Sequence, residues 1–422
     1  MWELIQASKR KSWILFIAMG IFLLLVGYVI GVAWFGAQYG VIGLYLALCI
    51  WFILSLVSYF SGDSILLSVS RAKAVSRDVH PQLFNVVEEM KLSANLPVMP
   101  KIYIIDEPAP NAFATGRSPE KSSIAVTAGL LSRLNRDELQ GVIAHEMSHI
   151  INRDVLYMTF AGVMLGSIVM LSHVFLRSMW YSSSSSRRYR SSSSSRDGGG
   201  AQVIMLVVAV VLAILAPLIA RLFYFSLSRR REYLADASAV RLTRYPEGLA
   251  SALEKIASAH IPLPSANPIT ASMYIANPLQ KKRAVKTNLW GTHPPLLERI
   301  AILKNMTHGA NYRDYQQAFM SAKGKSTSIM PTSALSDSEP IPLRHAMREQ
   351  TSERSTKKRA RDVGDLMRTL NKYVFLSCLC GMRIKVPPQF KGKEIKCTRC
   401  GRSVEVPLSD IKTIGSMIDA QK

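Results

Sequence analysis

The chain has 422 residues, of which 49% are hydrophobic, and a formal net charge of +23. This length allows two or three compact units. The charge does not make the chain a nucleic-acid-binding protein, because the basic residues are scattered over membrane flanks and a polar tail without a recognisable binding module. A basic protein that faces anionic lipid is the more ordinary explanation. We therefore expect the lipid bilayer as a partner and no specific nucleic acid.

Four apolar runs are candidates for membrane helices. Residues 13–35 and 41–60 are each about 20 residues long and uncharged, which is enough to cross a bilayer. Basic residues flank this first pair at both outer ends, so the positive-inside rule places both ends in the cytoplasm. Residues 155–176 and 201–227 form a second pair. The serine- and arginine-rich stretch that joins them, residues 182–196, favours the cytoplasmic side, so the sequence leaves open whether this pair crosses completely.

Between the two pairs of apolar runs, the sequence alternates helix and strand patterns. Residues 83–92 predict a short amphipathic helix, and residues 101–106 and 122–127 predict strands bounded by turn residues. The segment from Asn111 to Gly116 lies between these strands. A small sheet beside a catalytic helix would offer an extended peptide an edge strand, but a purely structural strand fits the pattern equally well.

The next predicted helix is buried and carries the motif H-E-x-x-H. Asn135 can cap its N-terminus, with Glu138 at capping-box spacing, and apolar residues recur at three- and four-residue steps. His145 and His149 leave one face of the helix a turn apart and can bind one metal ion. Glu146 can reach the open coordination position without being a ligand. This context favours a metal site over a chance occurrence of a short motif.

A further helical pattern follows the fourth apolar run and carries Glu232 and Asp236 on one face. A catalytic zinc ion takes three protein ligands and water, so two histidines leave one place open. Glu232 suits this place, and Asp236 suits a carboxylate that orients a ligand imidazole. An arbitrary acidic pair at this spacing is more often a charged helix end. His293, before two prolines, is by itself most simply a loop histidine.

The C-terminal part changes character twice. Residues 306–371 are polar and low in aromatic residues, which predicts a flexible linker. Residues 372–410 predict a β zinc ribbon, because four of the five cysteines form two close pairs, each followed by glycine. The expected ligands of this closed structural site are Cys378, Cys380, Cys397 and Cys400. Disulfides are the alternative, but the charge rule places this tail in the reducing cytosol.

Four ordered segments over roughly residues 1–305 resemble one family. Residues 145–154 resemble the signature H-E-x-x-H-x-x-N-R-D of the membrane-bound M48 zinc metalloproteases of the HtpX type. The other three are similar to further motifs of that family: residues 111–116 to N-A-F-A-x-G, residues 231–236 to R-E-x-x-A-D, and residues 292–295 to T-H-P-P.

The resemblance implies a mainly helical, membrane-anchored gluzincin fold of the α+β class with a small sheet. We expect a two-helix anchor at residues 1–60 and a protease domain at residues 61–305 that the membrane hairpin 155–227 interrupts. The implied function is a zinc endopeptidase at the cytoplasmic face of a bacterial inner membrane, with several membrane passes. Its expected substrates are misfolded or damaged membrane proteins, as part of a stress response.

The resemblance also implies roles for particular residues. We expect one catalytic zinc ion on His145, His149 and Glu232. The ribbon and the serine- and arginine-rich stretch depart from the family's usual pattern, and the cysteine spacing of the ribbon predicts a second, structural zinc ion there. Glu146 is expected to act as general base, Asp236 to hold a ligand imidazole, and His293 to donate to the oxyanion. The segment expected to hold the substrate backbone extended consists of Asn111, Ala112, Phe113 and Ala114. The alternative is a membrane-tethered zinc-ribbon adaptor with an inactive protease fold, and the intact Glu146 argues against it.

Overall fold

The computed structural model describes residues 2–185, 199–259, 261, 263, 273–276, 293–324, 328–330, 335, 341–346, 353–371, 373–390 and 392–406. Residues 186–196 of the serine- and arginine-rich stretch, Thr292, and the end of the predicted ribbon after residue 406 lie outside the described residues. The described chain is mostly helical, with one four-stranded sheet and two small hairpin sheets. This confirms the predicted α+β class. One compact unit covers residues 1–130 and 134–349, and a second covers residues 131–133 and 350–422.

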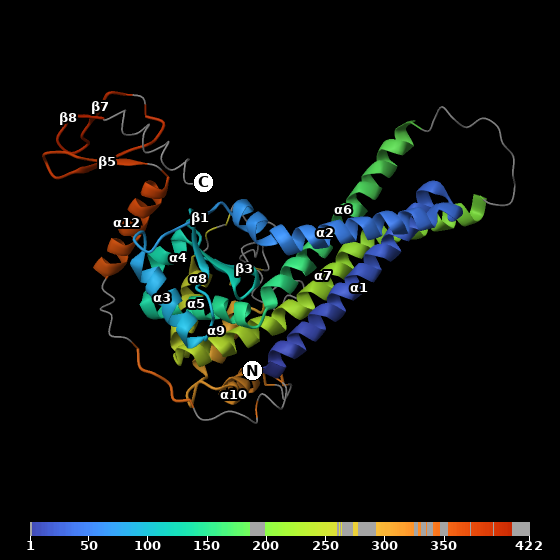
Figure 1. Ribbon diagram of the computed structural model, residues 1–422, viewed down its shortest axis with the longest axis horizontal. Coiled ribbons are helices and arrows are strands. Elements are labelled where there is room, and N and C mark those ends of the chain that lie inside the picture. The colour runs from blue at the N-terminus through green and yellow to red at the C-terminus, as the bar shows by residue number, and fades with distance from the viewer. Residues whose placement is uncertain are drawn as a thin grey trace. The chain divides into compact units, whose positions relative to one another are not determined.

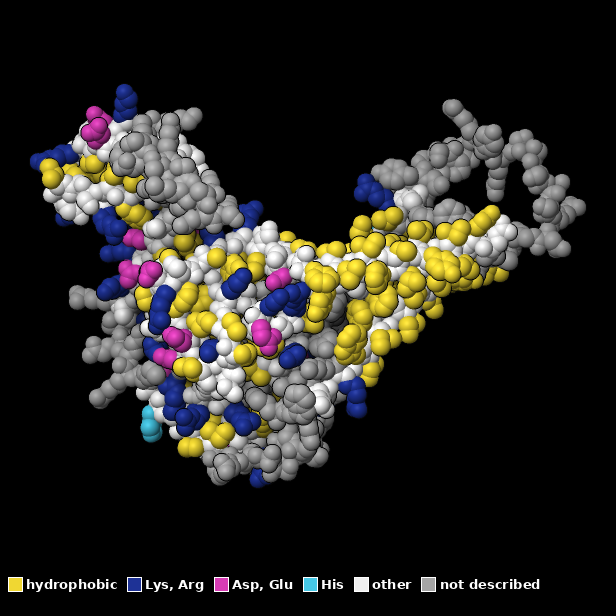
Figure 2. All heavy atoms as spheres, in the orientation of Figure 1, with side chains coloured by type: hydrophobic (Ala, Val, Ile, Leu, Met, Phe, Trp, Pro, Cys, Tyr) yellow, Lys and Arg dark blue, Asp and Glu magenta, His cyan; other side chains and the backbone are white. Residues whose placement is uncertain are grey.

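Two long apolar helices, α1 (Trp2–Phe35) and α2 (Gly40–Val69), begin the first unit. Both contain a segment long and apolar enough to cross a membrane, as the sequence predicts. Small residues allow a close approach of the two backbones, because a Cβ atom on Gly43 would lie 2.2 Å from the carbonyl oxygen of Gly27. Large apolar side chains such as Phe52 are exposed on these helices, as the hydrophobic band in Figure 2 shows. Such a surface suits contact with lipid.

Helices α6 (Asp154–Ser185) and α7 (Gly199–Thr243) pack against α1 through a shared apolar cluster that includes Leu23, Ile168 and Ala216. Their uninterrupted apolar segments within the described residues are only 10–17 residues long. A complete crossing by this pair therefore stays a prediction. Helix α7 is drawn as one long helix in Figure 1, and its second half, after the apolar segment, carries Glu232 and Asp236.

A mixed sheet supports one side of the first unit. Its strand order is β1 (Ala72–Ala74), β2 (Lys101–Ile105), β4 (Lys121–Thr127) and β3 (Ala112–Ser118). Strands β2 and β4 are parallel, and the other pairs are antiparallel. Both strands predicted from the sequence are confirmed, and the amphipathic helix predicted at residues 83–92 is α3 (Pro81–Ser93). A short helix, α4 (Ala128–Arg133), follows β4. Strand β3 lies at the edge of the sheet.

Helix α5 (Arg136–Ile151) carries the H-E-x-x-H motif and packs against α3, α7, β3 and α8 (Pro246–Ser258). Its predicted capping box is present, since the Glu138 amide donates to Asn135 Oδ1 at 2.9 Å and the Asn135 amide donates to Glu138 Oε2 at 2.8 Å. Helices α5 and α8 meet closely at Gly141, where a Cβ atom would lie 2.8 Å from the Leu249 backbone. The motif is thus fixed in the interior of the first unit.

The flexible linker predicted for residues 306–371 is wrong for residues 312–323, which form α10 (Tyr312–Lys323) beside α9 (Leu296–Lys304). Tyr315 and Phe319 of α10 are buried, and Asn311 and Asp314 form a capping box. The segment thus folds as a helix because its aromatic residues recur at helical spacing and are buried, although its average composition is polar.

The prediction also fails for residues 341–346, which lie along the first unit. The Arg344 guanidinium donates to Asp137 Oδ1 at 2.8 Å and to Gln140 Oε1 at 2.6 Å, both on the first turns of α5. It also donates to the carbonyl oxygen of Thr243, at the end of α7, at 2.9 Å. This segment, which we call the Arg344 strap (residues 341–346), ties the start of α5 to the end of α7.

The second unit contains helix α12 (Glu353–Leu370) and two hairpins. The hairpins pair β5 (Val374–Ser377) with β6 (Arg383–Val386), and β7 (Glu394–Lys396) with β8 (Ser403–Glu405). Their small core combines Cys378 and Cys397 with apolar residues such as Ile384. Lys385 of β6 donates to Asp365 of α12 at 2.6 Å, so this helix belongs to the ribbon unit and is not linker, contrary to the sequence-based boundary at residue 372.

Candidate active site and metal centres

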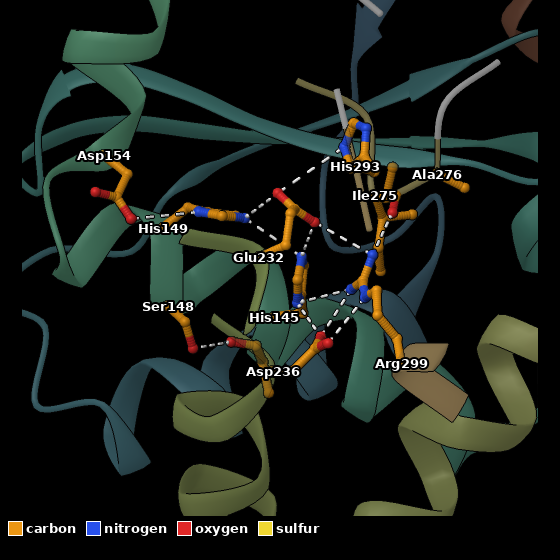
Figure 3. A network of polar contacts seen from close by, with 12 residues as sticks. His145, Ser148, His149, Asp154, Glu232, Asp236, Ile275, Ala276, His293 and Arg299 are labelled. Atoms are coloured by element: carbon orange, nitrogen blue, oxygen red, sulfur yellow. Dashed lines mark hydrogen bonds and ion pairs between the residues drawn. The ribbon is translucent and has the colours of Figure 1, made fainter. Parts of the chain in front are cut away.

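The first site forms where α5 faces the polar half of α7. The Nε2 atoms of His145 and His149 lie 3.3 Å apart, and Figure 3 shows both rings pointing at Glu232. Glu232 Oε2 lies 3.6 Å from His145 Nε2, and Glu232 Oε1 lies 3.6 Å from His149 Nε2. His145 and Glu232 are buried, and the His149 side chain is 15% exposed. The structure thus brings together the three residues predicted to bind the catalytic metal.

The spacing of these three groups fits a zinc ion. A tetrahedral zinc ion with nitrogen and oxygen ligands at about 2.1 Å separates neighbouring ligand atoms by about 3.4 Å. The observed separations of 3.3 and 3.6 Å agree with this geometry. Glu232 Oε2 is buried and makes no contact of full hydrogen-bond geometry among the described residues, although Arg299 Nη1 lies 3.2 Å from it as an ion pair.

Each histidine has a carboxylate on the side of its ring away from this centre. Asp236 Oδ1 lies 2.9 Å from His145 Nδ1, with both side chains fully buried. Asp154 Oδ2 lies 3.6 Å from His149 Nδ1. At 2.9 Å, Asp236 accepts the Nδ1–H of His145 and leaves the lone pair of Nε2 for a metal, whereas the contact of Asp154 with His149 is longer than a hydrogen bond. The sequence indicates this position for Asp236, whereas it assigns no role to Asp154.

The charges of the site act on one another strongly. Burial disfavours ionised Glu232, but the charges of His293, His145 and Arg299 outweigh it and hold the pKa of Glu232 well below its usual range. Burial likewise favours neutral His145, but the nearby carboxylates of Asp236 and Glu232 outweigh it and raise the pKa of His145 to about 9. The site therefore holds its ligand carboxylate in the ionised form that a metal requires.

Glu146 lies in the cleft beside the two histidines. The lining of the cleft includes Glu146, His149, Glu232, Ala114, Met158 and Met273. Both carboxylate oxygens of Glu146 are buried without a partner of hydrogen-bonding geometry among the described residues. Burial raises the pKa of Glu146. A buried, unpartnered carboxylate in a cleft is suited to proton transfer.

The predicted substrate-side segment divides into two parts. The first part, Asn111 and Ala112, is hydrogen-bonded to residues 274–276 of the same chain. The Ile275 amide donates to the Ala112 carbonyl oxygen, and Asn111 Nδ2 donates to the Ala276 carbonyl oxygen, both at 2.9 Å. Phe113 packs edge-to-face on Tyr274. Of the four residues predicted to contact the substrate, only Ala114 lines the cleft.

His293 lies just before α9, and Arg299 lies within this helix. His293 is buried, with its Nε2 atom 3.9 Å from Glu232 Oε1, so it lies beside the centre as the sequence predicts. Arg299 is completely buried and donates to both oxygens of Asp236. Arg299 was not predicted from the sequence, although it occupies a position on the apolar stripe of α9 between Leu296 and Leu303.

The four ribbon cysteines form a second candidate metal centre. The Sγ atoms of Cys378 and Cys400 lie 3.5 Å apart and those of Cys380 and Cys397 lie 3.6 Å apart, with all four within 4.8 Å of one another. These distances exceed a disulfide bond of about 2.05 Å. They fit a zinc ion with sulfur ligands at about 2.3 Å. Backbone N–H groups of Arg399 and Cys400 lower the pKa of Cys397 to about 6, which favours the thiolate.

The fold and the site together define a metallopeptidase of the H-E-x-x-H class. The model of "Peptidase family M48" matches residues 77–307. The chain is 46% identical to a "Protease HtpX homolog" of Dictyoglomus thermophilum over 305 residues, which are 72% of this chain and 94% of that protein. It is 43% identical to a "Protease HtpX homolog" of Listeria monocytogenes over 307 residues, which are 72% of this chain and 100% of that protein. The chain belongs to peptidase family M48 and is a metalloprotease of the HtpX type.

Among solved structures, the chain is similar to the crystal structure of S. mikatae Ste24p, with 21% identity over 72% of this chain and 67% of that chain. The TM-score of 0.36 is too low to support an inference about function. Helices α10 and α12, the Arg344 strap and the ribbon all follow residue 307, where the match to the family model ends.

Proposed function

We propose that this metalloprotease is a membrane-bound zinc endopeptidase whose catalytic ion is held by His145, His149 and Glu232. The observation that carries the proposal is the convergence of these three groups beside a cleft that also contains the unpartnered carboxylate of Glu146. A zinc ion bound there supplies Lewis-acid polarisation of the scissile carbonyl. The four ribbon cysteines hold a second, structural zinc ion.

The protein's own groups carry the proton transfers. Glu146 takes a proton from the attacking water and returns it to the leaving amine. Its buried position in the cleft beside His149 and Glu232 supports this role. Asp236 accepts the Nδ1–H of His145 and fixes the ring. His293 is the candidate donor to the carbonyl oxygen of the substrate.

The substrate reaches the cleft from β3 and α6. Ala114 of β3 lines the cleft, so a peptide can pair with this edge strand from Ala114 onward, beyond the part that residues 274–276 occupy. Val155 and Met158, on the first turns of the apolar helix α6, line the same cleft. A cleft at the start of apolar helices supports misfolded membrane proteins as substrates. The distribution of basic residues supports a cytoplasmic site at a bacterial inner membrane, with several membrane passes.

The experiment that tests the substrate class uses the full chain in lipid vesicles with one membrane protein in a folded and a destabilised form. We expect the destabilised form to be cleaved faster, and a zinc chelator to stop its cleavage. Equal cleavage of both forms would contradict a role in quality control. An inactive adaptor is not favoured, because the base and the three ligand groups are all in place.

A further inference from the structure

The Arg299 guanidinium forms a bidentate salt bridge with the Asp236 carboxylate. Arg299 Nε donates to Asp236 Oδ2 at 2.8 Å, and Arg299 Nη2 donates to Asp236 Oδ1 at 2.7 Å. Both side chains are fully buried. This two-point contact fixes the plane of the carboxylate as well as its position. Asp236 Oδ1 is the same oxygen that lies 2.9 Å from His145 Nδ1, so the arginine indirectly sets the direction of the His145 ring.

The third nitrogen of Arg299 joins two other parts of the site. Nη1 lies 3.2 Å from Glu232 Oε2 and donates to the carbonyl oxygen of Ile275 at 2.8 Å. Glu232 is a candidate zinc ligand, and Ile275 belongs to the segment that pairs with β3. Figure 3 shows the guanidinium between the two acidic residues of α7 and this segment. The Arg299 side chain therefore contacts the candidate ligand Glu232, the carboxylate of Asp236 that orients the ligand His145, and the segment around Ile275 that pairs with β3.

The position of Arg299 has two opposite physical effects on a metal ion. Its positive charge, 3.2 Å from a ligand oxygen, repels a second cation and would weaken zinc binding. Its rigid hydrogen bonds hold the two carboxylates of α7 in the binding geometry, which would strengthen zinc binding. The direction of the change in zinc affinity when Arg299 is removed shows which effect is larger.

We propose that Arg299 is a positioning residue of the catalytic centre and that its net effect is to strengthen zinc binding by orienting Asp236, and through it His145, together with Glu232. This role rests on the proposed function, since it assumes zinc at His145, His149 and Glu232. Carboxylates that orient ligand histidines typically contribute about 10- to 100-fold in metal affinity, and the arginine acts through such a carboxylate.

The test measures the zinc dissociation constant of the full chain by competition with a chelator. The reference chain carries Cys397→Ser and Cys400→Ser, so that the ribbon does not contribute metal. In this background we expect Arg299→Met, which keeps an apolar chain of similar length, to weaken zinc binding about 10- to 100-fold. Arg299→Lys keeps the charge but loses the two-point contact, and it should weaken zinc binding to an intermediate extent.

Arg344→Met is the matched control. It removes another guanidinium that bonds to an acidic and an amide side chain, here Asp137 and Gln140 on the first turns of α5, at the end of that helix away from His145 and His149. We expect it to leave the zinc dissociation constant unchanged, although it should lower the unfolding temperature. A purely structural role of Arg299 would change only the unfolding temperature, as in this control.

Unchanged or tighter zinc binding in a folded Arg299→Met chain would overturn the proposal. If Arg299→Met does not fold, Arg299→Lys decides, because zinc binding equal to that of the reference would overturn the proposal as well. A folded reference chain that binds no zinc would contradict the proposed function itself, and the role of Arg299 with it.

Discussion

Asp236 Oδ1 and His145 Nδ1 lie 2.9 Å apart in the interior of the first unit, with neither side chain accessible to solvent. The two residues are on different helices, α7 and α5, and are 91 positions apart in the sequence. Their contact fixes which nitrogen of His145 faces the metal centre. It also favours the protonated imidazole when no metal is present, with a consequence for the pH dependence of zinc binding.

Zinc uptake by the catalytic centre should release a proton. In the metal-free chain the pKa of His145 is raised to about 9, so His145 is protonated at pH 7.5, whereas zinc requires the neutral ring. The zinc affinity should therefore fall as the pH falls below about 9 and level off above it. Calorimetry at pH 7.5 in buffers of different ionisation enthalpy measures the released protons, in a chain whose ribbon cysteines are replaced. Zinc uptake without proton release would contradict this prediction.

Glu232→Ala should remove zinc from the catalytic centre, because two histidines alone bind the ion weakly. Metal content after dialysis, again in a chain with Cys397→Ser and Cys400→Ser, gives the result directly. Glu254→Ala is a suitable control, since Glu254 is exposed and forms an ion pair with the exposed Lys304 on the surface. Near-stoichiometric zinc in the Glu232→Ala chain would exclude Glu232 as a ligand.

Arg344→Ala should destabilise the first unit. The substitution removes hydrogen bonds to Asp137, Gln140 and the Thr243 carbonyl oxygen, and the side chain is only 23% exposed. We expect a loss of about 1–3 kcal/mol in the free energy of unfolding. Hydrogen exchange at the first turns of α5 should become faster. Arg313→Ala, which removes bonds to one exposed carbonyl oxygen, should have a smaller effect, and equal protection of α5 in both variants would argue against the strap.

The ribbon unit should fold only with zinc. Its hairpins are short and its core contains two of the cysteines, so the metal–sulfur bonds supply most of the folding free energy. A fragment of residues 350–422 should show folded circular dichroism with zinc and lose it on chelation. Truncation of the chain before residue 350 should leave cleavage of a short peptide unchanged. Loss of this cleavage in a truncated chain that still binds catalytic zinc would make the ribbon part of the active unit.

The sequence was sufficient to predict the helices and strands that carry the site. The capping box at Asn135 and Glu138 and the apolar periodicity of α5 are local signals, and the structure contains both. The convergence of His145, His149 and Glu232 was also predictable, because a zinc site needs a third ligand and Glu232 follows the motif order of the family. Each of these predictions rests on spacing within one element or on a known motif.

Arg299 and the Arg344 strap could not be predicted in the same way. Their roles depend on contacts between segments far apart in the sequence, such as Arg344 with Asp137, and arginine is most often a surface residue. Helix α10 was missed although Tyr312, Tyr315 and Phe319 have helical spacing, because the average composition of the long polar segment masked this local pattern.

The central claim is that Glu146 acts as the base beside a zinc ion held by His145, His149 and Glu232. The most direct test compares cleavage of casein by the purified native chain and by Glu146→Gln, together with the zinc content of both. Gln fills the same space and leaves the three ligand groups in place, so we expect full zinc content and a rate lower by about 100- to 10,000-fold. A Glu146→Gln chain that binds zinc and cleaves casein at close to the native rate would contradict the claim.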